Sequence, residues 1–373
     1  MSKIRILFFI HDLIHGGAEK VLVNLANHLP PEHYDVTIAT MFDVGVNRQF
    51  IAPHIHYHGG FRHLLPGNSI LFRYIPRVWL WKMLLPGEFD LAVAYLEGTT
   101  TRVLAGFPHA TKRIAWVHVE QQSNGMQHGF RSMSEVRQVY DSYDHIVCVS
   151  QGVKDNFQSL CPTNTPVSVL YNVNETDRII AGGKEPVEDS RFRTDFPTLI
   201  GVGKIIQGKG FFRLARIHQR LLLDGIQHRI YLLGVGDQQR EIEAYCKEHH
   251  LESTFICLGY DTNPYKYVAK CSAFVCSSFA EGFSTAATEA IVLGVPVITT
   301  EVAGMKELLG ENNEYGIIVP NDEEALYQGL KKLLTTPGML DYYRNRAKEH
   351  GRMFSMQKTI TSHQQFFEEV LKS

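Results

Sequence analysis

The 373-residue sequence has no long uncharged hydrophobic run, no paired-cysteine motif and no excess of basic residues. No stretch approaches the ~18 uncharged apolar residues that a membrane-spanning helix needs. The six cysteines form no CxxC pair, so we expect free thiols in a reducing cytosol and no disulfide framework. The formal net charge is −2, which argues against a nucleic-acid partner. The N-terminal segment carries Asp12 and lacks a cleavage site, so it predicts a first strand and not a signal peptide.

What the sequence contains is an alternation of short apolar runs with segments of helical apolar spacing. Runs rich in Val and Ile and bounded by Gly, Asn, Asp or Pro are typical of strands buried on both faces. The expected strands are Ile4–Ile10, Tyr34–Thr40, Leu91–Tyr95, Arg113–Val117, His145–Ser150, Val167–Tyr171, Thr198–Val202, Arg229–Leu233, Phe255–Leu258, Ala273–Ser277 and Pro296–Thr299. Helices are expected between them, for example at Ala18–Leu29, Phe212–Asp224 and Gln238–His250. This order predicts the doubly wound α/β class.

The pattern restarts once, after a polar, acidic stretch near residues 176–194. The length also fits two domains better than one. We therefore expect one Rossmann-like domain over residues 1–180 and a second over 190–350, with a ligand cleft between them. The last segment, residues 354–373, has the pattern of a helix.

Glycines follow the first strand of each half. Gly16-Gly17 lies between a strand and a helix, where backbone N–H groups can approach an anion. A strand–helix turn that needs a positive φ is the alternative, and taken alone the pair favours it. The second half opens with GVGKIIQGKG, in which Lys204 and Lys209 flank a glycine-rich turn and could neutralise a diphosphate. Two solvated loop lysines are the alternative. The spacing fits neither a phosphate-binding P-loop nor a dinucleotide-binding GxGxxG motif.

A pair of carboxylates is the most specific feature. Glu281 lies in EGFST, which reads as a loop entering a helix at Ala286–Leu293. Glu289 would then lie about one turn inside this helix, where it could accept hydrogen bonds from a ribose diol. The backbone N–H groups of Gly282, Phe283, Ser284 and Thr285 could meet a phosphate or a sugar. Acids that cap a surface helix are the alternative.

Together these motifs resemble the retaining family 4 glycosyltransferases of the GT-B fold. The resemblance rests on Glu281-x7-Glu289 followed by GVPVI and Gly304, and on HGGAE, VCVSQGVKDNF, VLYNVN and GVGKIIQGKG in family order. It covers residues 7 to 320 and implies a GT-B architecture of two Rossmann-like domains facing a cleft. It also implies that the last helix crosses back to the N-terminal domain.

The resemblance assigns roles to individual residues. Gly16 and Gly17 would face the donor phosphate, and Lys204 and Lys209 would hold the diphosphate. Glu281 would bind the transferred sugar, and Glu289 the ribose. The resemblance also implies that His118 contacts the donor sugar near the reaction centre. The family usually has arginine where Lys204 stands, so the forked geometry of a guanidinium is lost there.

These roles predict transfer of a hexose or N-acetylhexosamine from a nucleotide sugar, expected to be UDP-linked, with retention at the anomeric carbon. Lysines and helix N-termini can stabilise the leaving diphosphate without metal, and no DxD-like cluster stands near the expected site, so no cofactor is expected. An epimerase or phosphorylase of the same shape, or a non-catalytic sugar-nucleotide-binding protein, remains an alternative. The expected acceptor is a glycan on a polyprenyl diphosphate in surface polysaccharide synthesis.

Residues 44–87 contain no Asp or Glu. Their basic residues are Arg48, Arg62, Arg73, Arg77 and Lys82. Within them, residues 61–87 include two of the three tryptophans, Trp79 and Trp81. This composition predicts contact with an anionic bilayer, and hence an enzyme peripheral on the inner face of the cell membrane; an amphipathic helix packed on its own domain is the alternative. The alternating His54, His56 and His58 are more typical of a strand than of a metal site.

Overall fold

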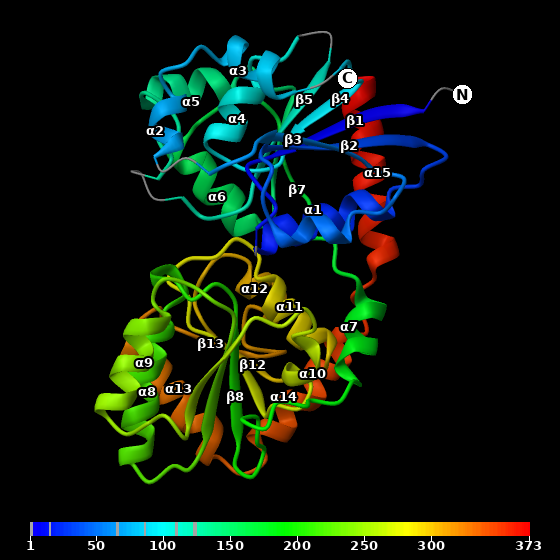
Figure 1. Cartoon of the computed structure of the whole chain (residues 1–373). Helices are drawn as coiled ribbons and strands as arrows, with labels where there is room; N and C mark the ends of the chain where they lie inside the picture. The colour runs from blue at the N-terminus through cyan, green and yellow to red at the C-terminus, as the bar shows by residue number, and fades with distance from the viewer. Residues whose placement is uncertain (1–2, 15, 65–66, 86, 109–110, 122–124) are drawn as a thin grey trace. The chain divides into compact units, whose positions relative to one another are not determined.

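The computed structural model describes residues 3–14, 16–64, 67–85, 87–108, 111–121 and 125–373. The chain divides into two compact units, each built on a parallel sheet with helices on its faces (Figure 1). Unit 1 comprises Met1–Val173 and Met356–Ser373, and unit 2 comprises Asn174–Ser355. The two Rossmann-like domains expected from the sequence are therefore both present.

The seven strands of the sheet in unit 1 are all parallel, in the order β3-β2-β1-β4-β5-β6-β7. The strands are β1 Ile4–Ile10, β2 Tyr34–Phe42, β3 His56–Phe61, β4 Leu91–Ala94, β5 Lys112–Val117, β6 His145–Cys148 and β7 Val167–Val169. The helices are α1 Gly17–His28, η1 Val46–Phe50, α2 Asn68–Phe72, α3 Arg77–Leu84, α4 Thr99–Leu104, α5 Met133–Tyr140, α6 Gln151–Leu160 and α15 Met356–Lys372.

The sheet of unit 2 has six parallel strands in the order β10-β9-β8-β11-β12-β13. Its strands are β8 Thr198–Val202, β9 Arg229–Leu233, β10 Phe255–Gly259, β11 Ala273–Cys276, β12 Val297–Thr300 and β13 Ile317–Val319. Its helices are α7 Thr176–Gly183, η2 Gln207–Lys209, α8 Phe211–Leu223, α9 Gln239–Glu248, α10 Tyr265–Val268, α11 Thr285–Val292, α12 Met305–Leu309, α13 Glu323–Thr335 and α14 Met339–Gly351.

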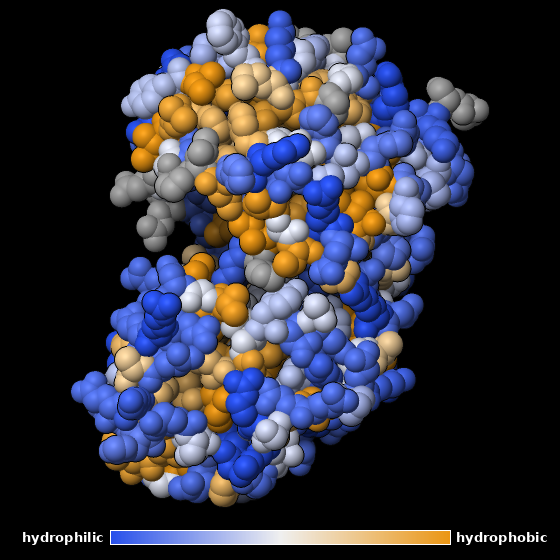
Figure 2. Space-filling model, viewed as in Figure 1, coloured by the Kyte–Doolittle hydropathy of each residue, from blue (hydrophilic) through white to orange (hydrophobic). Residues whose placement is uncertain are grey.

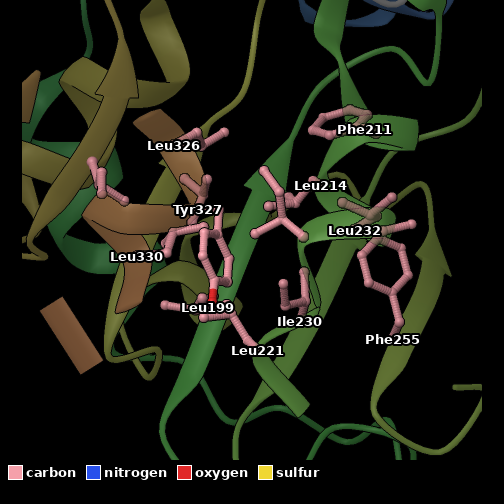
Figure 3. Close-up of a cluster of buried hydrophobic side chains, with 14 of the residues drawn as sticks. Leu199, Phe211, Leu214, Leu221, Ile230, Leu232, Phe255, Leu326, Tyr327 and Leu330 are labelled. Atoms are coloured by element: carbon pink, nitrogen blue, oxygen red, sulfur yellow. The ribbon is translucent and has the colours of Figure 1, made fainter. Parts of the chain in front are cut away.

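Apolar side chains on both faces of each sheet explain why the strands read as continuous hydrophobic runs. In unit 1, residues 6–10 of β1 are fully buried, as a central parallel strand requires. In unit 2, α8 and α13 pack on one face of the sheet, where Leu214 and Leu330 meet Leu199 and Ile230 (Figure 3). The two cores hold the strand ends, and hence the loops after them, in fixed positions.

The chain passes from unit 1 to unit 2 after Val173 and returns to unit 1 at Met356. The segment that follows Val173 folds as α7, which packs on α10 and α11 of unit 2, and Asn263 donates a hydrogen bond to the Gly182 carbonyl at 3.1 Å. Near the C-terminus, α15 belongs to unit 1. Its His363 ring stacks on Trp116 at 5.6 Å, and Phe367 contacts Phe8 at 6.2 Å.

The strands expected from the sequence are all present, with ends shifted by a few residues. Two further strands, β3 and β13, lie at sheet edges. β13 has three residues, too few for a periodic pattern to show. In β3, His56 and His58 pair alongside β2, in agreement with the strand interpretation of the alternating histidines. Within the described ranges, no group of three His, Cys, Asp or Glu side chains is arranged to hold a metal ion.

Candidate functional site

Both sheets contain a point at which the order of the strands reverses. In unit 2 the chain runs outward one way from β8 and the other way from β11, so the connections after these neighbouring strands lead in opposite directions across the sheet. In unit 1 the same reversal falls between β1 and β4. Doubly wound sheets bind ligands outside the carboxyl ends of the strands at such points. Each unit therefore has one site that its topology favours.

In unit 2 the loop after β8 is the glycine-rich turn with both predicted lysines. Lys204 is half-buried at the start of the turn, and Lys209 ends the short η2. Gly210, with φ of +64°, is the N-cap of α8, and a Cβ here would lie 2.0 Å from the Ser277 carbonyl oxygen. Glycine is needed at this position because the loop after β8 touches the loop after β11 there.

Hydrogen bonds fasten these two loops to each other. Phe279 N–H donates to the Gly208 carbonyl at 2.9 Å, and the Ser277 hydroxyl donates to the Lys209 carbonyl at 2.9 Å. Arg213 of α8, only 3% exposed, donates to the Ser277 carbonyl through Nε at 2.9 Å and Nη2 at 2.6 Å. These contacts to backbone carbonyl oxygens therefore fix the position of Lys209 relative to the loop that carries Glu281.

Lys209 and Glu281, 72 residues apart in the chain, form an ion pair. Lys209 Nζ lies 2.6 Å from Glu281 Oε1, and the Ser278 hydroxyl donates to the same oxygen at 2.5 Å. Burial lowers the pKa of Lys209, but the Glu281 carboxylate and Cys276 outweigh it, and the net shift is upward. The ammonium therefore stays charged at neutral pH.

The remaining predicted residues of unit 2 lie at the start of α11. Ser284 is the N-cap, and its hydroxyl accepts a hydrogen bond from the Ala287 N–H. Glu289 is buried one turn further on and accepts a 3.3 Å hydrogen bond from the Tyr265 hydroxyl. Gly282 and Phe283 precede the cap and pack against Gly304. Thr285 is the first residue of the helix. The structure thus brings all eight residues predicted for unit 2 onto the two loops at its reversal point and the start of α11.

The Gly16-Gly17 pair lies where the sequence predicts, at the start of α1 in unit 1. The Glu19 carboxylate covers Gly16, because a Cβ on Gly16 would lie 1.9 Å from Glu19 Oε2. Glu19 is itself buried. A carboxylate therefore already stands at the N-terminus of this helix, where positive potential would otherwise favour a phosphate.

The reversal point of unit 1 contains a pocket of about 480 Å³, a size that suits a small-molecule ligand. It is lined by His11, Asp12, Ser69, Leu96, Glu97, Gly98, Thr99, Thr100, Gln121, Gly125, Met126, His128 and Tyr140. His11 follows β1, and Glu97 follows β4. These described lining residues include carboxylates and imidazoles but neither Lys nor Arg. The pocket is therefore suited to hydroxyl groups and poorly suited to a diphosphate.

The acids of this pocket are held by hydrogen bonds. Asp12 accepts from the Ile14 N–H at 2.9 Å and lies 2.6 Å from His11 Nδ1. Glu97 accepts from the His118 N–H at 3.0 Å and from Gln121 Nε2 at 3.1 Å. Burial raises the pKa of Glu97, and the two hydrogen bonds oppose this rise.

His118 is buried at the end of β5, with its ring 4.7 Å from that of Tyr95. Burial lowers the pKa of His118 to about 3, so the ring is neutral at physiological pH. Its Nε2 hydrogen-bonds to no other described residue. A buried polar atom of this kind is costly unless a ligand or a water meets it. Its neutral state suits a polar contact to a sugar better than proton transfer.

Sequence reasoning missed Asp12, Glu97 and Arg213 as site residues. The only available signal was that Asp12 and Glu97 each come just after a buried strand. Arg213 gave no signal, because a basic residue in an amphipathic helix usually faces solvent.

Comparison with known proteins identifies the family of the chain. A family model described as "Glycosyltransferase Family 4" matches residues 15–178, and one described as "Glycosyl transferases group 1" matches residues 184–350. The chain is 32% identical over 370 residues to a Campylobacter jejuni enzyme named N-acetylgalactosamine-N,N'-diacetylbacillosaminyl-diphospho-undecaprenol 4-alpha-N-acetylgalactosaminyltransferase, covering 96% of this chain and 97% of that one.

Solved structures show the same architecture. The crystal structure of Anabaena HepE in complex with UDP and glucose matches with a TM-score of 0.79 at 16% identity, over 98% of this chain and 99% of that one. Sucrose-phosphate synthase from Thermosynechococcus elongatus matches with a TM-score of 0.77 at 16% identity, over 99% of each chain. Together with the family models and the Campylobacter relative, these matches show that the chain belongs to the family 4 glycosyltransferases and has the GT-B fold.

Proposed function

We propose that this glycosyltransferase moves a hexose or N-acetylhexosamine from a UDP-sugar to a glycan carried on a polyprenyl diphosphate, with retention at the anomeric carbon. The observation that carries the proposal is the Lys209–Glu281 pair at the strand reversal of unit 2. It supplies one fixed positive charge for a diphosphate and one fixed carboxylate for sugar hydroxyls.

In the proposed reaction the acceptor hydroxyl attacks the anomeric carbon from the face that the diphosphate leaves. The bond between the anomeric carbon and the diphosphate oxygen breaks, and the hydroxyl proton passes to that oxygen. Negative charge grows on UDP as the bond stretches, so Lys209, Lys204 and the N-terminus of α11 would stabilise the transition state more than the bound donor. This arrangement needs no metal ion.

Known proteins support the donor and the acceptor classes. HepE was solved with UDP and glucose, and the name of the Campylobacter relative specifies a glycan on diphospho-undecaprenol and an α-linkage. With an α-configured donor, an α-linked product means retention. A glycan on such a lipid would hold the enzyme at the inner face of the cell membrane, as a peripheral protein in surface polysaccharide synthesis. No described helix is long and apolar enough to cross a membrane.

The test is a measurement of UDP release from UDP-glucose, UDP-galactose, UDP-GlcNAc and UDP-GalNAc, with and without the acceptor named for the Campylobacter relative. We expect release that depends on acceptor, continues in EDTA and yields an α-linked product by NMR. Isomerised donor without release would show an epimerase. Release that requires a divalent ion would contradict the proposed charge stabilisation.

A further inference from the structure

Exposed apolar side chains gather in one short segment of unit 1. Seven of the eighteen large hydrophobic residues exposed in the described chain lie between residues 64 and 83. They are Leu64, Ile70, Leu71, Tyr74, Val78, Trp79 and Met83. Figure 2 shows hydrophobic surface over the part of unit 1 where Figure 1 places α2 and α3. Single exposed apolar residues are ordinary, but a cluster of this size indicates an interaction surface.

The two sides of α3 differ sharply. Val78, Trp79, Lys82 and Met83 are exposed, and this spacing places them on one side of a helix. On the opposite side Leu80 and Leu84 are buried, and Trp81 packs edge-on against Phe107 at 5.1 Å. One apolar side of α3 therefore packs on its own domain, and a second apolar side is exposed.

Buried and ordered contacts hold this segment in place. Arg102 of α4, 2% exposed, donates to the carbonyl oxygens of Phe72 and Ile75 at 3.0 Å each and pairs with Glu135 at 2.7 Å. Arg131 donates to the Arg73 carbonyl at 2.7 Å. The backbone is thus fixed so that the outer side chains face away from the core.

The charged residues between positions 44 and 87, the stretch that contains this apolar cluster, are all basic. Arg62 and Lys82 are exposed, and Arg73 and Arg77 are half-buried. No Asp or Glu occurs from residue 44 to residue 87, although the whole chain has a net charge of −2. Apolar and aromatic side chains interspersed with basic ones complement the headgroups and acyl boundary of an anionic bilayer. Long basic side chains reach the headgroups while their stems lie among apolar groups.

We propose that Leu64, Ile70, Leu71, Tyr74, Val78, Trp79 and Met83, with Arg62 and Lys82, form a docking surface for an anionic lipid bilayer, in which Trp79 enters the headgroup region. The docking does not depend on the transfer reaction. If the proposed function also holds, α2 joins the two sites. Its Ser69 lines the pocket of unit 1 while Ile70 and Leu71 belong to the docking surface. A sugar on a lipid diphosphate would then reach the pocket close to the bilayer.

Flotation with vesicles tests the docking surface. Vesicles of phosphatidylcholine with phosphatidylglycerol should bind the full chain, and vesicles of phosphatidylcholine alone should bind it at least tenfold less. The double variant Trp79→Ser/Met83→Ser and the double variant Arg62→Gln/Lys82→Gln should each lower binding at least tenfold. The matched controls are Leu223→Ser/Met353→Ser and Arg240→Gln/Lys247→Gln, which change residues exposed on unit 2 and should bind as the parent does.

Tryptophan fluorescence gives an independent reading. Among the three tryptophans Trp79 is 68% exposed, whereas Trp116 is 1% exposed and Trp81 is half-buried. Adding anionic vesicles should shift the emission to shorter wavelength, and Trp79→Phe should remove this shift. The proposal would be overturned by equal binding to both kinds of vesicle, or by an emission shift that persists in Trp79→Phe. It would also be overturned if the surface served only for self-association of the protein at higher concentration. The rise in Tm caused by UDP, measured on the same variants, shows whether donor binding is intact. Loss of vesicle binding can then be told apart from loss of donor binding.

Discussion

Arg213 donates two hydrogen bonds to one acceptor, the carbonyl oxygen of Ser277, through Nε at 2.9 Å and Nη2 at 2.6 Å. Its Nη2 also reaches the Ser278 carbonyl at 2.8 Å and Asn321 Oδ1 at 3.0 Å. A buried guanidinium thus holds the end of β11 against α8 without a carboxylate among these acceptors. Since the loop that carries Glu281 begins here, Arg213 positions the loop that we propose binds the donor.

Arg213→Lys should therefore lower the free energy of unfolding of unit 2 by about 2 to 4 kcal/mol, because a lysine cannot reach these acceptors together and leaves buried carbonyls unpaired. Thermal unfolding with and without UDP measures both stability and donor binding. Arg216→Lys is the control, since Arg216 pairs with Glu323 at the surface and should cost less than about 1 kcal/mol. If the two substitutions changed stability and UDP binding equally, the positioning role of Arg213 would be contradicted.

Lys209 and Glu281 should have separable effects. Lys209→Met should weaken UDP binding about 10- to 100-fold, because it removes the charge that we propose holds the diphosphate. Glu281→Gln should leave UDP binding within a few-fold of the parent but lower transfer at least ~100-fold, the scale for a lost transition-state contact. Calorimetric UDP titrations and transfer rates measure the two effects. Strong loss of UDP binding in Glu281→Gln would show that the carboxylate serves only to place the lysine.

His118→Ala should lower transfer at least ~100-fold while UDP binding persists, because His118 belongs to unit 1. Since burial lowers the pKa of His118 to about 3, its ring stays neutral throughout pH 5 to 8. The loss caused by His118→Ala should therefore be constant over this range. A loss that disappears below pH 6.5 would mean that the imidazole acts as a base.

Glu97→Gln should raise the acceptor KM about tenfold or more with little change in donor affinity, because a carboxylate in the unit 1 pocket accepts sugar hydroxyls more strongly than an amide does. Acceptor and donor titrations of the transfer rate measure this. The matched control is Glu88→Gln, which makes the same charge change at an exposed residue before β4. A donor KM that rises as much as the acceptor KM would contradict an acceptor role for this pocket.

Buried neutral histidines should make the fold sensitive to acid. Burial lowers the pKa of His363 to about 4, below its ordinary 6.5, so its contribution to stability is complete above pH 6.5 and is lost as the pH falls from 6.5 to 4. The loss is about 1.4 kcal/mol per pH unit. His363→Phe keeps an aromatic ring against Trp116 and should flatten the fall of Tm between pH 7 and 5. The exposed His33→Gln should leave the slope unchanged.

The strand and helix pattern, the two-domain organisation and the candidate donor-binding residues of unit 2 could all be predicted from the sequence. This was possible because buried parallel strands and glycine-rich turns leave local patterns, and because Lys209, Glu281 and Glu289 lie in motifs that resemble a known family. Only the tertiary structure brought Asp12 and Glu97 into one pocket, because their neighbourhood depends on the pairing of β1 with β4. It also decided that Arg213 is buried and that Trp79 is exposed while Leu80 beside it is not. Whether a helical side chain is buried or exposed depends on which side of the helix packs on the sheet. Contacts between segments distant in sequence determine that side.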